Sequence, residues 1–115
     1  KLEKLEIYKG KIGNAGAKAI ATVVGTNTTI KKLILQENDI EEQGARELAK
    51  MLEKNTSLTD LDISDNKFGD IAGTTILEAL RRNPETALKV IDVGDCGLSA
   101  EVKDRFDSFQ GDKYQ

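Results

Sequence analysis

The chain has 115 residues, the size of one ordinary domain, and its 17 basic and 20 acidic side chains give a net charge of −3. This balance favours neither nucleic acid nor an anionic membrane as a partner, and no run of 18 apolar residues is present to span a bilayer. The sequence has no histidine and one cysteine, so it lacks the usual general base and cannot form an intrachain disulfide. We therefore expect a reducing compartment and a cytoplasmic location.

Four segments share one aliphatic pattern and predict four short strands, each followed by a turn. Each has an aliphatic residue at its first, fourth and sixth positions and an apolar residue at its eleventh. Their first residues are separated by 28, 28 and 30 positions, and the longer last spacing comes from two extra residues between Asn83 and Leu88. The segments are 2–12, 30–40, 58–68 and 88–98.

Helices are predicted between these segments, over residues 15–27, 43–55 and 72–83. Apolar residues recur there at i, i+1 and i+4, which is one face of a helix of three to four turns. An asparagine closes each helix, and we expect it to adopt the left-handed conformation that follows many helix ends. These residues are Asn27, Asn55 and Asn83, of which the first two also begin potential glycosylation motifs. We favour the capping role because the rest of the sequence is typical of a cytosolic protein.

A fourth helix is predicted over residues 99–109, where Val102, Phe106 and Phe109 fall on one face. Ser99 precedes it as an N-cap. This helix would cover the carboxyl-terminal end of the apolar core. Residues 111–115 are polar, and we expect them to form a frayed tail.

The pattern LxxLxLxxN(C)xL, with its 28-residue period and helices ending in N-T-[TS]-[LI], resembles the ribonuclease-inhibitor-like class of leucine-rich repeats. The resemblance implies an α/β fold, a right-handed strand–helix solenoid in which four parallel strands line a concave face and the helices form the convex face. The repeats would span residues 2–29, 30–57, 58–87 and 88–110 of a single domain. Solenoids need capped ends, and Leu2 already lies in the first strand. We therefore expect the chain to be part of a longer repeat protein.

The resemblance also assigns a structural role to one position after each strand. The side-chain amides of Asn38 and Asn66 would bond to the backbone of neighbouring turns, and Cys96 would fill the same position as a buried thiol. Gly10 occupies it in the first repeat and has no side chain to contribute. We expect the first turn to be less well ordered for this reason.

Acidic side chains cluster between Leu58 and Asp70, and this raises the possibility of a calcium site. A calcium-binding loop beginning at Asp60 would need glycine at its sixth position, which is Asp65. We therefore expect no metal ion and no cofactor here.

The alternation of strand side chains places a set of residues on the concave face, the side of the sheet away from the helices. Asp62 would lie beside Asp92, and Asp65 beside Asp95; such like-charge pairs destabilise neighbouring strands. Either these residues serve a partner with a basic surface, or they are solvated polar positions. The candidate partner-binding residues are Tyr8, Lys32, Ile34, Gln36, Asp60, Asp62, Asp65, Asp92 and Asp95.

The sequence contains no nucleophile–base pair and no glycine-rich phosphate loop that would indicate an enzyme. We therefore predict a non-enzymatic module that binds a protein partner through its concave face. Two alternatives come from proteins with similar repeats. The tropomodulin family carries an actin-binding array of this kind, and Ran GTPase-activating proteins use the same class of repeat.

Overall fold

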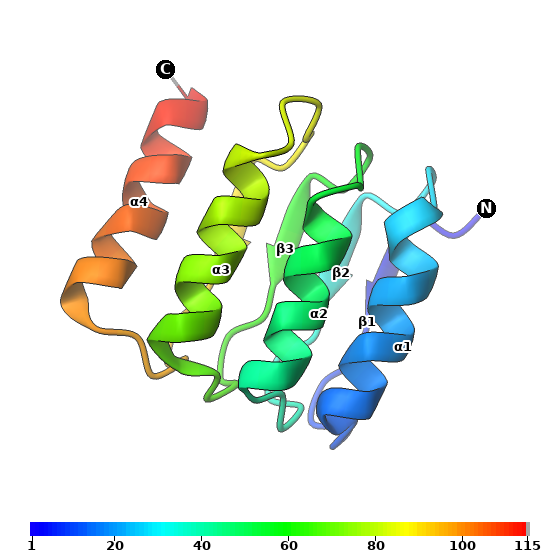
Figure 1. Cartoon of the computed structure of the whole chain (residues 1–115). Coiled ribbons are helices and arrows are strands. Elements are labelled where there is room, and N and C mark those ends of the chain that lie inside the picture. Colours follow the sequence, from blue (N-terminus) through cyan, green and yellow to red (C-terminus); the bar gives the residue numbers. More distant parts are fainter. Residues whose placement is uncertain (115) are drawn as a thin grey trace.

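The computed structural model describes the backbone of residues 1–114 and the side chains of residues 1–109. Strands and helices alternate strictly along the chain, as the repeat pattern predicts (Figure 1). The elements are β1 (Lys4–Glu6), α1 (Gly13–Thr26), β2 (Lys32–Ile34), α2 (Glu42–Leu52), β3 (Asp60–Asp62), α3 (Gly69–Arg81), β4 (Val90–Asp92) and α4 (Ala100–Tyr114).

The four strands form one parallel sheet in the order β1-β2-β3-β4. Residues at the same position of successive repeats are partners, so that Leu33 pairs with Leu5 on one side and Leu61 on the other. The helices lie side by side over one face of the sheet, and the other face is left uncovered (Figure 1). The predicted leucine-rich-repeat solenoid is confirmed.

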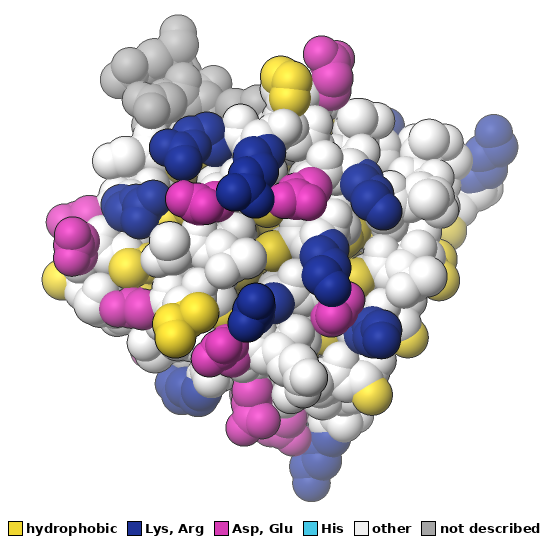
Figure 2. Space-filling view, viewed as in Figure 1, with side chains coloured by type: hydrophobic (Ala, Val, Ile, Leu, Met, Phe, Trp, Pro, Cys, Tyr) yellow, Lys and Arg dark blue, Asp and Glu magenta, His cyan; other side chains and the backbone are white. Residues whose placement is uncertain are grey.

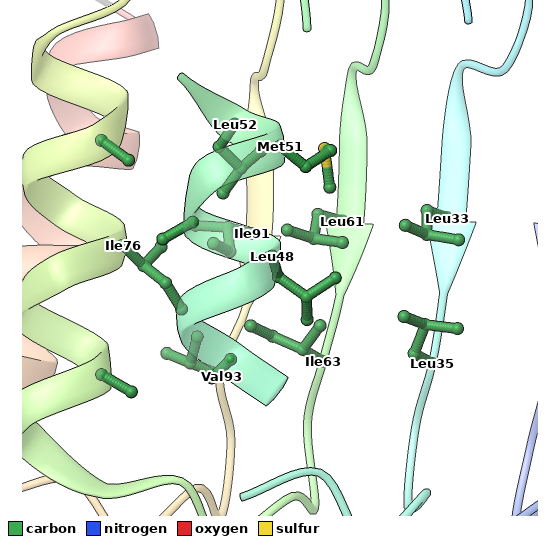
Figure 3. Packing of buried hydrophobic residues seen from close by; sticks show 14 of the residues in the cluster. Leu33, Leu35, Leu48, Met51, Leu52, Leu61, Ile63, Ile76, Ile91 and Val93 are labelled. Carbon is green, nitrogen blue, oxygen red and sulfur yellow. The ribbon is translucent and has the colours of Figure 1, made fainter. Parts of the chain in front are cut away.

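The core lies between the sheet and the helices. The central residue of each later strand points inward, and Leu33, Leu61 and Ile91 are at most 1% exposed. Leu48 of α2 and Ile76 of α3 meet them from the helical side (Figure 3). Burial of these side chains stabilises the fold by roughly 1.5–3 kcal/mol each. The buried side chains of all four repeats form one continuous cluster, so no repeat buries its apolar face alone.

The carboxyl-terminal end of the core is covered by α4. The Ser99 hydroxyl accepts the backbone N–H of Val102 at 3.3 Å, which caps the first turn. Val102 and Phe106 are buried, and Phe109 is half-buried against the core. The backbone of α4 continues to Tyr114, beyond the boundary at residue 110 that we placed from sequence. The side chains of the expected tail, residues 111–115, lie outside the described part of the chain.

Within the described residues, no helix has the length and apolar character needed to cross a membrane.

Candidate functional site: the concave face and the turns that support it

Asn66 ties the turns after β2 and β3 together. Its side chain is 1% exposed, and its Oδ1 accepts the backbone N–H groups of Asn38 at 2.8 Å and Ile40 at 3.0 Å. Its Nδ2 donates to the carbonyls of Leu35, Ile63 and Ser64, at 2.9, 3.0 and 3.1 Å. All the hydrogen-bonding capacity of the amide is therefore used inside the protein.

The residues at the same position of the second and fourth repeats, Asn38 and Cys96, also bond to the turn of the preceding repeat. Asn38 Nδ2 donates to the carbonyl of Ile7 at 2.7 Å, and its Oδ1 accepts the N–H of Gly10 at 2.6 Å. The first turn is thus bonded through its backbone, although Gly10 has no side chain to contribute. The Cys96 thiol is 1% exposed and donates to the carbonyl of Ile63 at 3.2 Å. Burial raises the pKa of this thiol to about 11, so it remains protonated at neutral pH.

The three asparagines that close the helices play a different role from the one we predicted. Asn27 has φ −77° and ψ 141°, an extended conformation, and none of the three lies among the residues with positive φ. Instead, Asn55 accepts the N–H groups of Ser57 and Leu58 through Oδ1, and its Nδ2 reaches the carbonyl of Val24 at 2.8 Å. The left-handed cap prediction was therefore wrong.

These residues form a second series of bonds between repeats, at the opposite end of the strands from Asn66. Asn83 repeats the arrangement, since its Nδ2 donates to the carbonyls of Leu52 at 2.9 Å and Asn55 at 2.8 Å. Leu52 is the last residue of the preceding helix, and Asn55 lies in the turn after it. The two central strands, β2 and β3, are therefore held at both ends by asparagine side chains.

Asn14 joins adjacent repeats at a third place. It lies in the first turn of α1, and its Oδ1 accepts the backbone N–H groups of Glu41 and Gly44, both at 2.9 Å. These groups open α2, which has no side-chain cap of its own. One helix thus caps the next, as an N-cap residue would cap its own helix.

The carboxylates of the concave face are oriented by their own turns. Asp62 and Asp92 are partners in the register of β3 and β4. Asp62 Oδ1 accepts the Ser64 N–H at 3.0 Å and the Ser64 hydroxyl at 2.7 Å, and Asp92 Oδ1 accepts the Gly94 N–H at 2.9 Å. In each case the bonds use Oδ1, which leaves Oδ2 available to a partner.

A shallow hollow lies beside these carboxylates, and its lining comes from β2, β3 and β4. Its volume is about 180 Å³, and apolar side chains from β2 and β4 contribute to its wall beside the acidic ones. The hollow unites five of the nine residues that the sequence placed at the partner site. Its lining is Lys32, Ile34, Asp60, Leu61, Asp62, Val90 and Asp92.

The other four predicted residues do not line this hollow. Asp65 Oδ2 accepts the Gln36 amide at 3.2 Å, across the turns that follow β2 and β3. The Asp95 side chain is exposed in the turn after β4. Tyr8 is 52% exposed after β1, and its hydroxyl donates to Glu6 at 3.2 Å.

Charges are paired on the helical side of the molecule but not among the concave-face aspartates. Basic and acidic side chains alternate over the helices (Figure 2), where Arg82 contacts both Glu53 and Glu78 within 3.5 Å. Among the described side chains, no Lys or Arg lies within 4.0 Å of a concave-face aspartate carboxylate. Nor do the described residues contain a group of three or more His, Cys, Asp or Glu side chains placed to hold a metal ion.

A parallel sheet with helices on one side and amide-bonded turns defines a strand–helix repeat solenoid. The sequence pattern of the leucine-rich repeat family matches residues 1–21, 26–49 and 54–77, and the chain belongs to that family.

The solved structures that share this fold include a leiomodin domain and a tropomodulin domain. The actin-binding site 2 domain of leiomodin-1 superposes with a TM-score of 0.75 at 16% identity, covering 96% of this chain and 80% of that one. The tropomodulin C-terminal domain of Caenorhabditis elegans gives a TM-score of 0.60 at 15% identity, covering 99% and 85%. No curated protein sequence matches this chain significantly.

Proposed function

We propose that this chain is a non-enzymatic interaction module that binds a protein partner through the concave face, with the hollow at β2–β4 as the main contact. The observation that carries the proposal is the set of aspartates that lack an ion pair within the described part of the molecule. Asp62 and Asp92 stand opposite each other on adjacent strands, an arrangement that destabilises a sheet by up to about 1 kcal/mol. A bound cation would relieve this repulsion.

The hollow favours a lysine or arginine side chain of the partner. Such a side chain has an aliphatic stem and a charged end. The stem fits against Ile34 and Val90, while the charged end reaches the free oxygens of Asp62 and Asp92. Lys32 at the margin would orient the partner by repelling a second positive charge. Proteins with an exposed basic segment are therefore the expected class of partner, and a cytoplasmic location fits this role.

Selection from a random peptide library tests the proposal without knowledge of the partner. We expect peptides enriched in lysine and arginine to bind the immobilised chain, and to bind the Asp62→Asn/Asp92→Asn variant about 5- to 30-fold more weakly. This corresponds to about 0.5–1 kcal/mol for each partly exposed charge. Asp104→Asn is the matched control, because Asp104 is an exposed carboxylate on α4. Peptides without basic residues, or equal binding to all three chains, would refute the proposal.

Actin is a second candidate partner, because the solved neighbours include an actin-binding domain. The likeness is one of fold, at 16% identity. Cosedimentation with actin filaments, and sedimentation velocity with monomeric actin, test it directly. If actin uses the concave face, the Asp62→Asn/Asp92→Asn variant should lose binding and the Asp104→Asn variant should keep it. Absence of binding to both forms of actin would remove this candidate and leave the general proposal standing.

A further inference from the structure

The amino-terminal flank of the molecule, formed by the outer edge of β1 and the outer side of α1, has the features of a repeat interface without a repeat upon it. The sheet order leaves the outer backbone edge of β1 without a strand partner among the described residues. Leu2, the first aliphatic residue of the repeat pattern, is 56% exposed. Its counterparts in the next three repeats, Ile30, Leu58 and Leu88, are at most 3% exposed.

The outer side of α1 is apolar where the neighbouring helices are already covered. Val23 is 63% exposed, whereas the residues 28 and 56 positions later, Met51 and Ala79, are each 2% exposed. Met51 and Ala79 are covered because a preceding helix packs beside each of them. Lys18 is the one charged residue in the fourteen of α1. A helix that is apolar on two sides is typical of one packed on two sides.

The amide of Asn27 identifies the kind of element that belongs on this flank. In the next two repeats, Asn55 and Asn83 use Nδ2 to bind carbonyls at the end of the preceding helix. Asn27 uses its Oδ1 in the same way as they do, accepting the N–H groups of Thr29 and Ile30 at 2.7 and 2.6 Å. Its Nδ2 has no partner among the described residues. By analogy with Asn55 and Asn83, the Asn27 Nδ2 group indicates that the carbonyl end of a helix belongs beside it.

We propose that a further strand–helix repeat of the same polypeptide covers this flank. Its strand would lie parallel to β1, and its helix would pack on Val23 and end beside the Asn27 amide. A second copy of the chain, paired antiparallel through β1, would instead bring the start of its α1 to Asn27. A helix start presents N–H groups, which cannot accept from an amide N–H.

Gly10 sets a limit on the contact at the other end of β1. It stands where Asn38 and Asn66 bind the turn of the preceding repeat, and it has no side chain to do so. A Cβ atom at Gly10 would lie 2.8 Å from Ile7 Cγ2, so a larger residue does not fit without displacement. The added repeat would thus be held by the strand edge, the helix packing and Asn27, with no amide bond at its turn. This second surface is independent of the partner proposed for the concave face.

The test adds a copy of residues 30–57 immediately before Leu2, which keeps the 28-residue register, and measures urea unfolding. We expect the extended chain to unfold at higher urea and its outer β1 amides to exchange more slowly with solvent. Val23→Lys should change the unfolding constant of the 115-residue chain by about twofold, as an exposed substitution. In the extended chain the same lysine would be buried, and the ratio of folded to unfolded protein should fall by more than about a hundredfold.

Asn27→Asp isolates the amide, because a carboxylate still accepts the N–H groups of Thr29 and Ile30 but cannot donate. We expect Asn27→Asp to change the ratio of folded to unfolded protein little in the 115-residue chain. In the extended chain the carboxylate would face carbonyl oxygens, and the same ratio should fall by more than about tenfold. Equal effects of both variants in the two chains would overturn the proposal. A dimer of the 115-residue chain that Val23→Lys dissociates would also overturn it, in favour of self-association.

Discussion

Replacing Asn66 with alanine should remove a large part of the stability of the domain. The substitution leaves the buried N–H groups of Asn38 and Ile40 without acceptors. An unsatisfied buried group costs about 1–3 kcal/mol, so the two together predict a loss of about 2–6 kcal/mol. Native domains are commonly stable by only about 5–15 kcal/mol. Urea unfolding followed by circular dichroism measures the change.

Two other amides provide a graded comparison. Asn14→Ala removes the acceptor that opens α2, a site nearer the surface, and should cost about 0.5–2 kcal/mol, as loss of an N-cap does. Gln43→Ala changes an exposed helical side chain and should stay within about 0.5 kcal/mol of the parent. Equal unfolding midpoints for Asn66→Ala and Gln43→Ala would refute the view that the buried amides hold the turns together.

Three further substitutions or reactions test separate parts of the fold. The pKa of the Cys96 thiol is about 11 in the folded chain, against 9.0 for an ordinary thiol, so the native chain should react slowly with thiol reagents at pH 8, and rapid labelling would contradict this. The free energy of unfolding should fall as the pH rises from 9 to 11, because the thiol of the unfolded chain ionises first. Gly73→Ala should destabilise the fold by about 1–3 kcal/mol, because the added Cβ would lie 2.8 Å from a Leu98 methyl group. Gly25→Ala should be neutral or stabilising by up to about 1 kcal/mol, because the nearest atom to its added Cβ, Met51 Cγ, is 3.9 Å away. A higher melting temperature for Gly73→Ala than for Gly25→Ala would contradict both expectations. Glu37 has φ 57°, so Glu37→Val should lower the melting temperature well below that of Glu37→Gly, and matching values would show that the left-handed backbone is not maintained.

The fold could be predicted because the aliphatic spacing of each strand recurs in register with the helices. A residue such as Leu61 has one place in such a repeat, between its strand neighbours and α2, and the period alone sets the sheet partners. The position of Asp62 on the concave face followed from strand alternation. The oxygen that Asp62 commits to Ser64 could not be predicted, because it depends on the local turn geometry.

The role of the helix-closing asparagines was mispredicted for a physical reason. The sequence marks Asn55 as the residue after a helix, and asparagine is compatible both with a left-handed cap and with an extended turn bonded to the next repeat. A signal was present: Asn27, Asn55 and Asn83 recur at the repeat period itself, as Asn38 and Asn66 do. Recurrence at that period favours a contact between repeats over a purely local one.

The most direct test of the concave-face proposal is chemical-shift mapping on this 12.6 kDa chain, titrated with a basic peptide from the library selection at physiological salt. We predict that the backbone amides of β3, β4 and their turns shift on binding, and that these shifts weaken as salt rises and in the Asp62→Asn/Asp92→Asn variant. Shifts confined to the outer surfaces of α1–α4, or unchanged in the variant, would contradict the proposal that the concave face binds the partner.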